Sequence, residues 1–286
     1  MRVRPPFVAG GFYPAGSREL HARIQELLAG SGVAPLPGVL GGLVPHAGYA
    51  YSGPTAAAFF ASVPEAPETV VFCGAVHVPG VRVASLDGSR AWCTPLGEIE
   101  PDRELAQAIL EQADGRLVSA PEAHDGDHAI EVQLPFVQVR WPDARFLALS
   151  VPADERALEV GRVVGEAIRR CGRAALVVAS SDLTHYGDRF GFTPFGIGRR
   201  ALERAHGEND VGLLERLEAL DAEGALAAAR RDHSACGGGA IAATWAAARV
   251  LGASSARILV HTSSSAVTGE ADADLSVGYG AAALLR

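Results

Sequence analysis

The sequence VLGGLVPHAGYAYSG, from Val39 to Gly53, joins a short apolar run to a turn rich in glycine. The apolar part, Val39–Val44, has the length and composition of a buried strand. His46 follows almost at once, with Gly48 and Gly53 beyond it. The stretch therefore predicts a strand that delivers a histidine to a tight turn before a helix. There the imidazole either serves a functional site or caps the helix.

The same alternation of short apolar runs and helical periods continues along the chain. It predicts further strands at Thr69–Cys73, Arg145–Val151, Ala174–Ala179, Arg257–His261 and Leu275–Leu285. Helical periods lie at Glu100–Gln112, Ala129–Val139, Val160–Ile168, Ala201–Glu218 and Gly238–Leu251, and we expect Pro135 to kink or end the second early. Strand–helix alternation predicts an α/β fold with a largely parallel or mixed sheet covered by helices. Because no linker or composition break divides residues 1–286, we expect one domain.

Polar side chains follow three of these strands at the point where each strand ends. His46 follows the first strand, His77 follows the strand ending at Cys73, and Asp182 and His185 follow the strand ending at Ala179. In open α/β sheets, ligands bind at the carboxyl ends of the strands. The sequence therefore predicts a functional site at this edge of the sheet, although His77 taken alone also fits a solvated loop.

The segment EAHDGDHAIEVQLPF, which begins at Glu122, crowds two histidines among acidic residues. Asp125 and Asp127 suit the first turn of a helix, whose dipole favours negative charge. That explanation does not cover His124 and His128. Ligand or substrate contact and helix capping both stay open for these two side chains.

The segment ASSDLTHYG, from Ala179 to Gly187, places Asp182 three residues before His185. A carboxylate beside an imidazole raises its basicity and fixes its tautomer, as a general base requires. Ser180 and Ser181 are not surrounded by a GxSxG elbow, which argues against a serine nucleophile here.

Cys236, in DHSACGGGA, is expected at the start of a helix. There the helix dipole and free N–H groups favour the thiolate, the form that binds metals. A buried structural cysteine is the alternative, and His233 is a rival ligand. We interpret the other histidines and cysteines as surface residues (His21, His206), a satisfied core histidine (His261) and structural thiols (Cys73, Cys171).

Composition limits the classes of partner and compartment. The 286 residues are 48% hydrophobic and 20% charged, and the net charge is −8. An acidic chain is not expected to bind nucleic acid or anionic membranes. No run approaches the roughly 18 apolar residues of a membrane span. The first residues, MRVRPPFVAGGFYP, have no apolar h-region, so we expect no signal peptide. The four cysteines lack CxxC spacing, so we expect a cytoplasmic protein without a disulfide framework.

Together these motifs resemble the Memo family over almost the whole chain. The matching segments are AGGFYP (9–14), HAGYAYSG (46–53), TPLGEIEPD (94–102), HAIEVQLPF (128–136), SSDLTHYG (180–187), CGGGA (236–240) and SVGYGAA (276–282). The resemblance implies a fold similar to the class III extradiol dioxygenases, which are non-haem iron enzymes. It also implies metal ligands at His46, His77 and Cys236, catalytic residues at Asp182 and His185, and substrate contacts at Tyr51 and His128.

Two imidazoles and one thiolate are similar to the facial triad of non-haem iron sites. Sulfur is a soft ligand, which favours Cu(I), Zn(II) or Fe(II) over Mg(II) or Ca(II). The resemblance to non-haem iron enzymes implies Fe(II) as the expected metal, with Cu or Zn as alternatives. The expected function is iron- or copper-dependent redox chemistry of the dioxygenase type. Rival interpretations are a metal carrier or peptide-binding adaptor without catalysis, a zinc hydrolase, and a structural zinc site. The expected partners are a small molecule or peptide, and the resemblance adds an AMMECR-type protein and a radical SAM protein.

Overall fold

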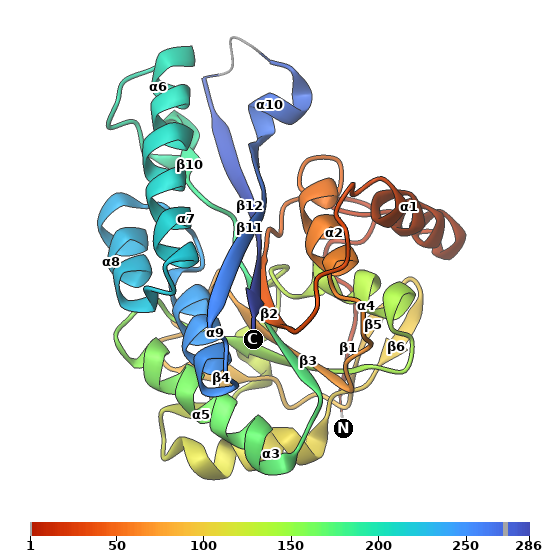
Figure 1. Cartoon of the computed structure of the whole chain (residues 1–286). Coiled ribbons are helices and arrows are strands. Elements are labelled where there is room, and N and C mark those ends of the chain that lie inside the picture. The colour runs from red at the N-terminus through yellow and green to blue at the C-terminus, as the bar shows by residue number, and fades with distance from the viewer. Residues whose placement is uncertain (1, 271–273) are drawn as a thin grey trace.

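The centre of the fold is a mixed sheet of nine strands within residues 2–270 and 274–286, the part of the chain that this computed structural model describes (Figure 1). Eight strands follow one another in the order β10-β12-β2-β9-β3-β8-β4-β7, and β11 pairs with β12. Their bounds are β2 Val39–Val44, β3 Thr69–Gly74, β4 Ala84–Leu86, β7 Leu117–Ser119, β8 Arg145–Ser150, β9 Ala175–Ser180, β10 His185–Tyr186, β11 Ser255–Ser263 and β12 Ser276–Leu285. A small sheet is formed by β1 Val3–Arg4, β5 Ala91–Thr94 and β6 Gly97–Ile99.

The four central strands, β2, β9, β3 and β8, are parallel to one another. They are rich in Val, Leu and Ala and almost wholly buried, as strands covered on both faces must be. Antiparallel pairing of β12 with β2, and of β4 with β8, makes the sheet mixed. The predicted α/β fold with a largely parallel or mixed sheet covered by helices is therefore confirmed.

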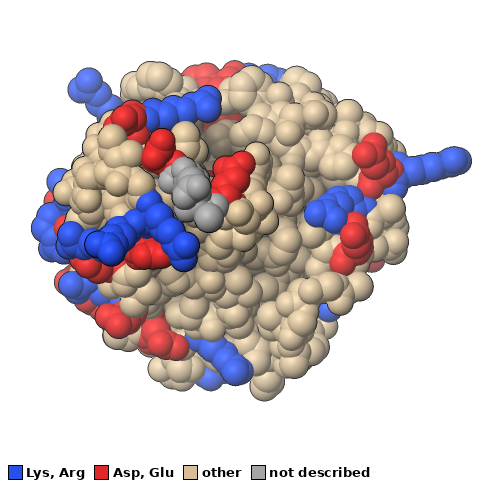
Figure 2. Space-filling view, turned by 90° about the horizontal axis from the view of Figure 1, so that it is seen from above, with Lys and Arg blue, Asp and Glu red and all other residues tan. Residues whose placement is uncertain are grey.

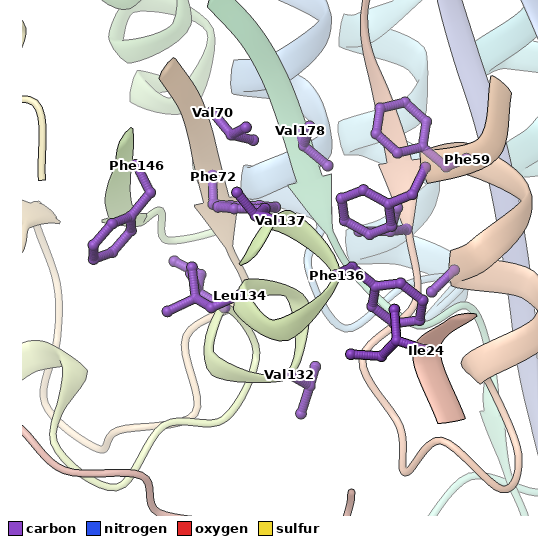
Figure 3. Close-up of a cluster of buried hydrophobic side chains, with 14 of the residues drawn as sticks. Ile24, Phe59, Val70, Phe72, Val132, Leu134, Phe136, Val137, Phe146 and Val178 are labelled. Carbon is purple, nitrogen blue, oxygen red and sulfur yellow. The ribbon is translucent and has the colours of Figure 1, made fainter. Parts of the chain in front are cut away.

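Helices cover both faces of this sheet (Figure 1). Alternate residues of one strand point to opposite faces, and in β3 Phe72 packs into one apolar cluster while Val71 packs into another. The Phe72 face carries α1 Ser17–Ala29, α2 Gly53–Ser62 and α4 Leu134–Arg140. Figure 3 shows part of this cluster, including Phe59, Phe72, Phe136 and Val178. The other face carries α3 Arg103–Ala113, α5 Arg156–Cys171, α7 Val211–Glu218, α8 Ala222–Asp232 and α9 Gly238–Val250.

The helices α5 and α9 approach each other closely at Gly161. A Cβ atom added to Gly161 would lie 2.1 Å from the carbonyl oxygen of Ala243. We expect Gly161→Ala to force the two helices apart and to lower the free energy of unfolding by about 1–3 kcal/mol. Urea denaturation measures this loss. Gly212→Ala in α7, where nothing lies within 4 Å of the new Cβ, is the matched control and should leave the protein as stable or raise its stability by up to about 1 kcal/mol. Equal stability changes in the two variants would contradict the close approach.

Several elements differ from the sequence expectation. The predicted helix at Ala129–Val139 is wrong in its first half, because α4 begins at Leu134 and Pro135 occupies its first turn. Proline is tolerated there, since the first N–H groups of a helix have no intrahelical partner. The expected helix at Ala201–Glu218 is interrupted by a π-helical turn, Ala205–Asp210, between α6 Arg199–Arg204 and α7. Figure 1 shows β11 and β12 running beyond the other strands to α10, Ser264–Thr268.

Among the described residues, no helix is both long enough and apolar enough to span a bilayer. That residues 1–286 form a single domain stays a prediction.

Candidate metal centre

Three histidine rings converge at the carboxyl edge of the parallel strands. His46 lies two residues beyond the end of β2, and His77 lies three residues beyond the end of β3. His128 comes from the loop before α4. The ring centroid of His46 is 5.1 Å from that of His77 and 5.4 Å from that of His128, and the His77 and His128 rings stack 4.9 Å apart. One ring nitrogen from each histidine lies within 4.8 Å of the other two, so this group could hold a metal ion.

Cys236 joins this cluster from the start of α9. Its Sγ lies 3.3 Å from His46 Nε2, and its backbone N–H donates to the carbonyl oxygen of Asp182. Zinc-sized ions bind imidazole nitrogen at about 2.1 Å and thiolate sulfur at about 2.3 Å, so two ligands of one ion lie no more than about 4.4 Å apart. The separation of Sγ and Nε2 therefore fits a shared ion.

The charge state of Cys236 also suits a metal ligand. Burial alone would raise the pKa of this thiol, but His46, His185 and His77 lower the pKa well below its usual value. Thiolate is the form that coordinates metals. The three histidines therefore favour the thiolate form of Cys236.

Hydrogen bonds fix the tautomer of His46. Its Nδ1 lies 3.3 Å from Ser180 Oγ, and the Ser180 hydroxyl donates to the carbonyl oxygen of Ala129. Because the Ser180 hydroxyl hydrogen is used in that bond, Ser180 Oγ can only accept a hydrogen bond from Nδ1–H of His46. Nε2 then faces Cys236 Sγ. Burial lowers the pKa of His46, but Cys236 and Asp182 more than offset this and raise it, so a metal ion would take the place of the proton on Nε2.

His77 is oriented in the same way by Asp127. The carboxylate accepts from the His77 backbone N–H at 3.0 Å, and its other oxygen lies 3.1 Å from Nδ1. Burial lowers the pKa of His77, but Asp127 and Cys236 more than offset this and raise the pKa to about 10. Asp127 thus holds Nδ1 protonated and leaves Nε2 for the centre of the cluster.

Asp127→Asn is expected to weaken metal binding by about 10- to 100-fold, the usual cost of removing a partner that orients a ligand. The amide can accept in place of only one of the two carboxylate oxygens that His77 uses. Competition titration with a metal chelator measures the change. Asp125→Asn is the control, since Asp125 is half exposed and pairs with Arg2. Equal affinities of the two variants would show that Asp127 does not support the site.

Asp182 links the cluster to His185. One carboxylate oxygen accepts from the His46 backbone N–H at 2.7 Å, and the other lies 3.7 Å from His185 Nε2. That distance is longer than a hydrogen bond, and within the described residues this buried Nε2 has no hydrogen-bond partner. Burial lowers the pKa of His185, but Asp182 and Cys236 raise it to about 10. His185 therefore holds a proton and has an unused hydrogen-bonding position.

His128 behaves differently from its neighbours. Burial and the positive charges of His46 and His77 lower its pKa to about 4, so it is neutral near pH 7. Its ring also contacts Phe12, with the centroids 4.8 Å apart. A neutral imidazole can bind a metal, which makes His128 a candidate ligand in addition to the predicted substrate contact. The crowded HDGDH segment had left a ligand role open for His128, whereas the family resemblance implied substrate contact.

The other residues singled out in the sequence lie away from the cluster or at its margin. Tyr51 is 45% exposed, and its role in substrate binding stays a prediction. His124 is a buried histidine bonded to Ser85 and Ser150, which excludes the ligand interpretation for it. His233 ends α8 in a left-handed conformation and packs on Phe192.

The surface interpretation holds for His21 but is wrong for His206, which is only 13% exposed on its side chain. His206 bonds to the buried carboxylate of Asp210, and His261 approaches the same carboxylate. Helical spacing suggested a polar surface here because the partner strand, β12, is some 70 residues away in the chain.

The sequence of the chain matches one protein family over nearly its whole length. The family described as Memo-like protein matches residues 4–283. A MEMO1 family protein of Methanosarcina mazei is 37% identical and covers 98% of both chains, and one of Methanopyrus kandleri is 37% identical and covers 99% of both. A crystal structure of an uncharacterized Escherichia coli K12 protein aligns with a TM-score of 0.44 and 18% identity, covering 77% of this chain and 88% of that chain.

Proposed function

The chain belongs to the Memo-like protein family, and on that premise we propose that it binds a redox-active metal ion through His46, His77 and Cys236. Iron(II) is the first choice of metal, and copper and zinc are the alternatives. The observation that carries the proposal is the 3.3 Å separation of Cys236 Sγ and His46 Nε2. His128 is a candidate for a further ligand, or for the ligand that replaces the thiolate.

The donor set supports a soft or borderline transition metal. Thiolate and imidazole favour iron, copper and zinc, whereas magnesium and calcium prefer oxygen ligands. Structural zinc sites usually have four ligands, while three protein ligands leave room for a substrate. His77 is 30% exposed on its side chain, which gives a small molecule access to the cluster.

We further propose that the chain catalyses dioxygenase-like redox chemistry. A bound iron or copper ion would supply the one-electron chemistry that side chains lack. His185 would hold and move a proton at Nε2, and Asp182 would stabilise its charged form. Phe190 packs on the His185 ring with centroids 5.0 Å apart and limits its contact with water. Tyr51 and His128 would contact the substrate, a small molecule or peptide.

The test uses anaerobically purified full-length protein loaded separately with iron(II), copper(I) and zinc(II). Oxygen consumption is measured with a panel of catechols and with ascorbate. The proposal expects turnover with iron or copper, its loss in Cys236→Ser, and its near loss in His185→Gln with metal content unchanged. Tight, exchangeable metal without turnover would favour the metal carrier or peptide-binding adaptor. Activity with zinc alone, toward esters or peptides, would favour the hydrolase.

Two further proposals rest on the sequence. We propose a cytoplasmic location, which the composition and cysteine pattern support, and an AMMECR-type protein and a radical SAM protein as partners, which only the family resemblance supports. Co-purification from cells that express all three proteins tests the partnership. Elution of this chain alone at every salt concentration would contradict it.

A further inference from the structure

A second polar cluster lies apart from the metal centre, around the buried carboxylate of Asp210. This side chain is fully buried at the end of the π-helical turn that joins α6 and α7. It accepts from the Thr184 backbone N–H at 3.0 Å, and its other oxygen lies 2.8 Å from His206 Nδ1 and 3.3 Å from His261 Nε2. A buried carboxylate with such partners stays ionised, because hydrogen bonds and positive charge favour its charged form.

The Asp210 carboxylate sets the direction of every hydrogen bond beyond it. Because the carboxylate only accepts, Nδ1 of His206 carries a proton, and Nε2 of the neutral ring is left as an acceptor. Ser276 Oγ lies 2.9 Å from that Nε2 and therefore donates to it. Having given its hydrogen away, Ser276 Oγ accepts from Ser265 Oγ, which is also 2.9 Å away. The result is a directed chain of hydroxyls that ends on a carboxylate-supported histidine.

Both links of the chain, from His206 to Ser276 and from Ser276 to Ser265, have the length of about 2.6–3.2 Å that joins a base to a nucleophile, and Asp210 orients the base. Ser276 itself is fully buried and cannot reach a substrate. Ser265 is partly exposed and lines a cavity of about 390 Å³. This volume lies within the range of small-molecule sites. Its other lining residues include Leu202, Glu203, His206, Ser263 and Ala266.

We propose that Ser265 is a nucleophile activated through Ser276 by the His206–Asp210 pair, and that the cavity takes small carboxylic esters. Ser265 Oγ attacks the ester carbonyl carbon, its proton passes to Ser276 Oγ, and the Ser276 proton passes to His206 Nε2. The new acyl–oxygen bond replaces the bond to the alcohol, which leaves with the proton returned along the same chain. Water then hydrolyses the acyl-serine and releases the acid. Ser263 Oγ, 3.1 Å from Ser265 Oγ, can donate to the developing alkoxide.

The setting of the cavity agrees with a small neutral substrate. Arg199 and Glu203 at its rim pair with each other, and the other carboxylate of the lining, Glu270, would repel an anion. Figure 2, a view from above Figure 1, shows basic and acidic side chains mixed on this end of the molecule. The apolar side chains of Leu202 and Ala266 line the cavity beside the hydroxyl groups.

A purely structural role for the same hydrogen bonds would be to hold α10 against β12. That role makes a different prediction, because it does not increase the reactivity of a hydroxyl.

The deciding experiment exposes the full chain to a fluorophosphonate probe and, separately, to p-nitrophenyl acetate. A metal chelator is present in both reactions. Mass spectrometry identifies the labelled serine, and the rate of labelling is followed over time.

We expect the probe to label Ser265 and the label to disappear in Ser265→Ala. Ser276→Ala and His206→Gln should each slow labelling and ester cleavage by about 100-fold or more, the lower range for a general base. Thr268→Ala, an exposed change on the same helix, should label at the parent rate. Circular dichroism checks that each variant is folded.

An unlabelled Ser265 in the parent chain would overturn the proposal, and so would equal labelling rates in the parent and Ser276→Ala. The Cys236→Ser variant separates this site from the metal centre. It should lose metal binding if the proposed function is right and keep the labelling of Ser265. Loss of metal binding and loss of labelling are thus independent results.

Discussion

The His46→Ala protein is expected to bind iron(II) or copper at least about 100-fold more weakly than the parent chain. Loss of an outer partner of a ligand already costs about 10- to 100-fold, and His46 is proposed to bind the metal itself. Its Nε2 faces Cys236 Sγ at 3.3 Å, and its ring lies close to those of His77 and His128. Removing this ring takes away the residue that every other candidate ligand contacts.

Elemental analysis after dialysis and competition titration with a chelator measure the loss in His46→Ala. His21→Ala is the matched control, because His21 is exposed on α1 and lies outside the histidine group. The control should keep the parent stoichiometry and affinity. Parent-like metal content in His46→Ala would remove His46 from the ligand set.

The Glu131→Ala protein is expected to lose about 3–5 kcal/mol of its free energy of unfolding, the usual cost of breaking a buried ion pair. The Glu131 carboxylate is fully buried and lies 2.7 Å from a guanidinium nitrogen of Arg4, which is itself 3% exposed. It also accepts from the Tyr13 hydroxyl and from the backbone N–H groups of Phe7 and Val8. The change would leave all these donors and one charge without an acceptor.

The ion pair of Arg4 and Glu131 also connects the N-terminal segment to the loop that carries Asp127 and His128. Arg4 donates to the backbone carbonyls of His124 and Asp127, next to His128. Urea denaturation measures the stability, and Glu26→Ala is the control because its pair with Arg23 is exposed. Such surface pairs contribute no more than about 1 kcal/mol. A loss in Glu131→Ala as small as that of the control would mean that this network does not stabilise the fold.

The sequence predicted the edge of the sheet where the site lies because strand ends are a local signal. His46, His77 and Asp182 each follow an apolar run within a few residues, and parallel strands bring such positions together. His128 gave no comparable signal, since it lies in a loop before the helix α4 and does not follow the end of a strand. Its stacking on His77 depends on how that loop folds back, which spacing along the chain does not encode.

Long-range partners also explain the sequence interpretations that failed. Glu131 fell within the predicted helix Ala129–Val139, whereas it is bonded to Arg4 and Tyr13 more than 100 residues away. His206 was assigned to the surface, whereas Asp210 and Ser276 bury it. In each case a polar residue looked solvated because its partner lies in a distant strand or segment. The helices α3, α5 and α9, whose apolar periodicity is local, were predicted, whereas α1 and α8 were not.

The most direct test of the metal centre is X-ray absorption spectroscopy of the zinc-loaded protein, because zinc–sulfur and zinc–nitrogen distances are well separated. The proposed ligand set predicts one sulfur scatterer at about 2.3 Å together with imidazole nitrogens at about 2.0–2.1 Å. The sulfur shell should vanish in Cys236→Ser. A first shell in the parent chain that contains only nitrogen and oxygen would contradict a site shared by Cys236, His46 and His77.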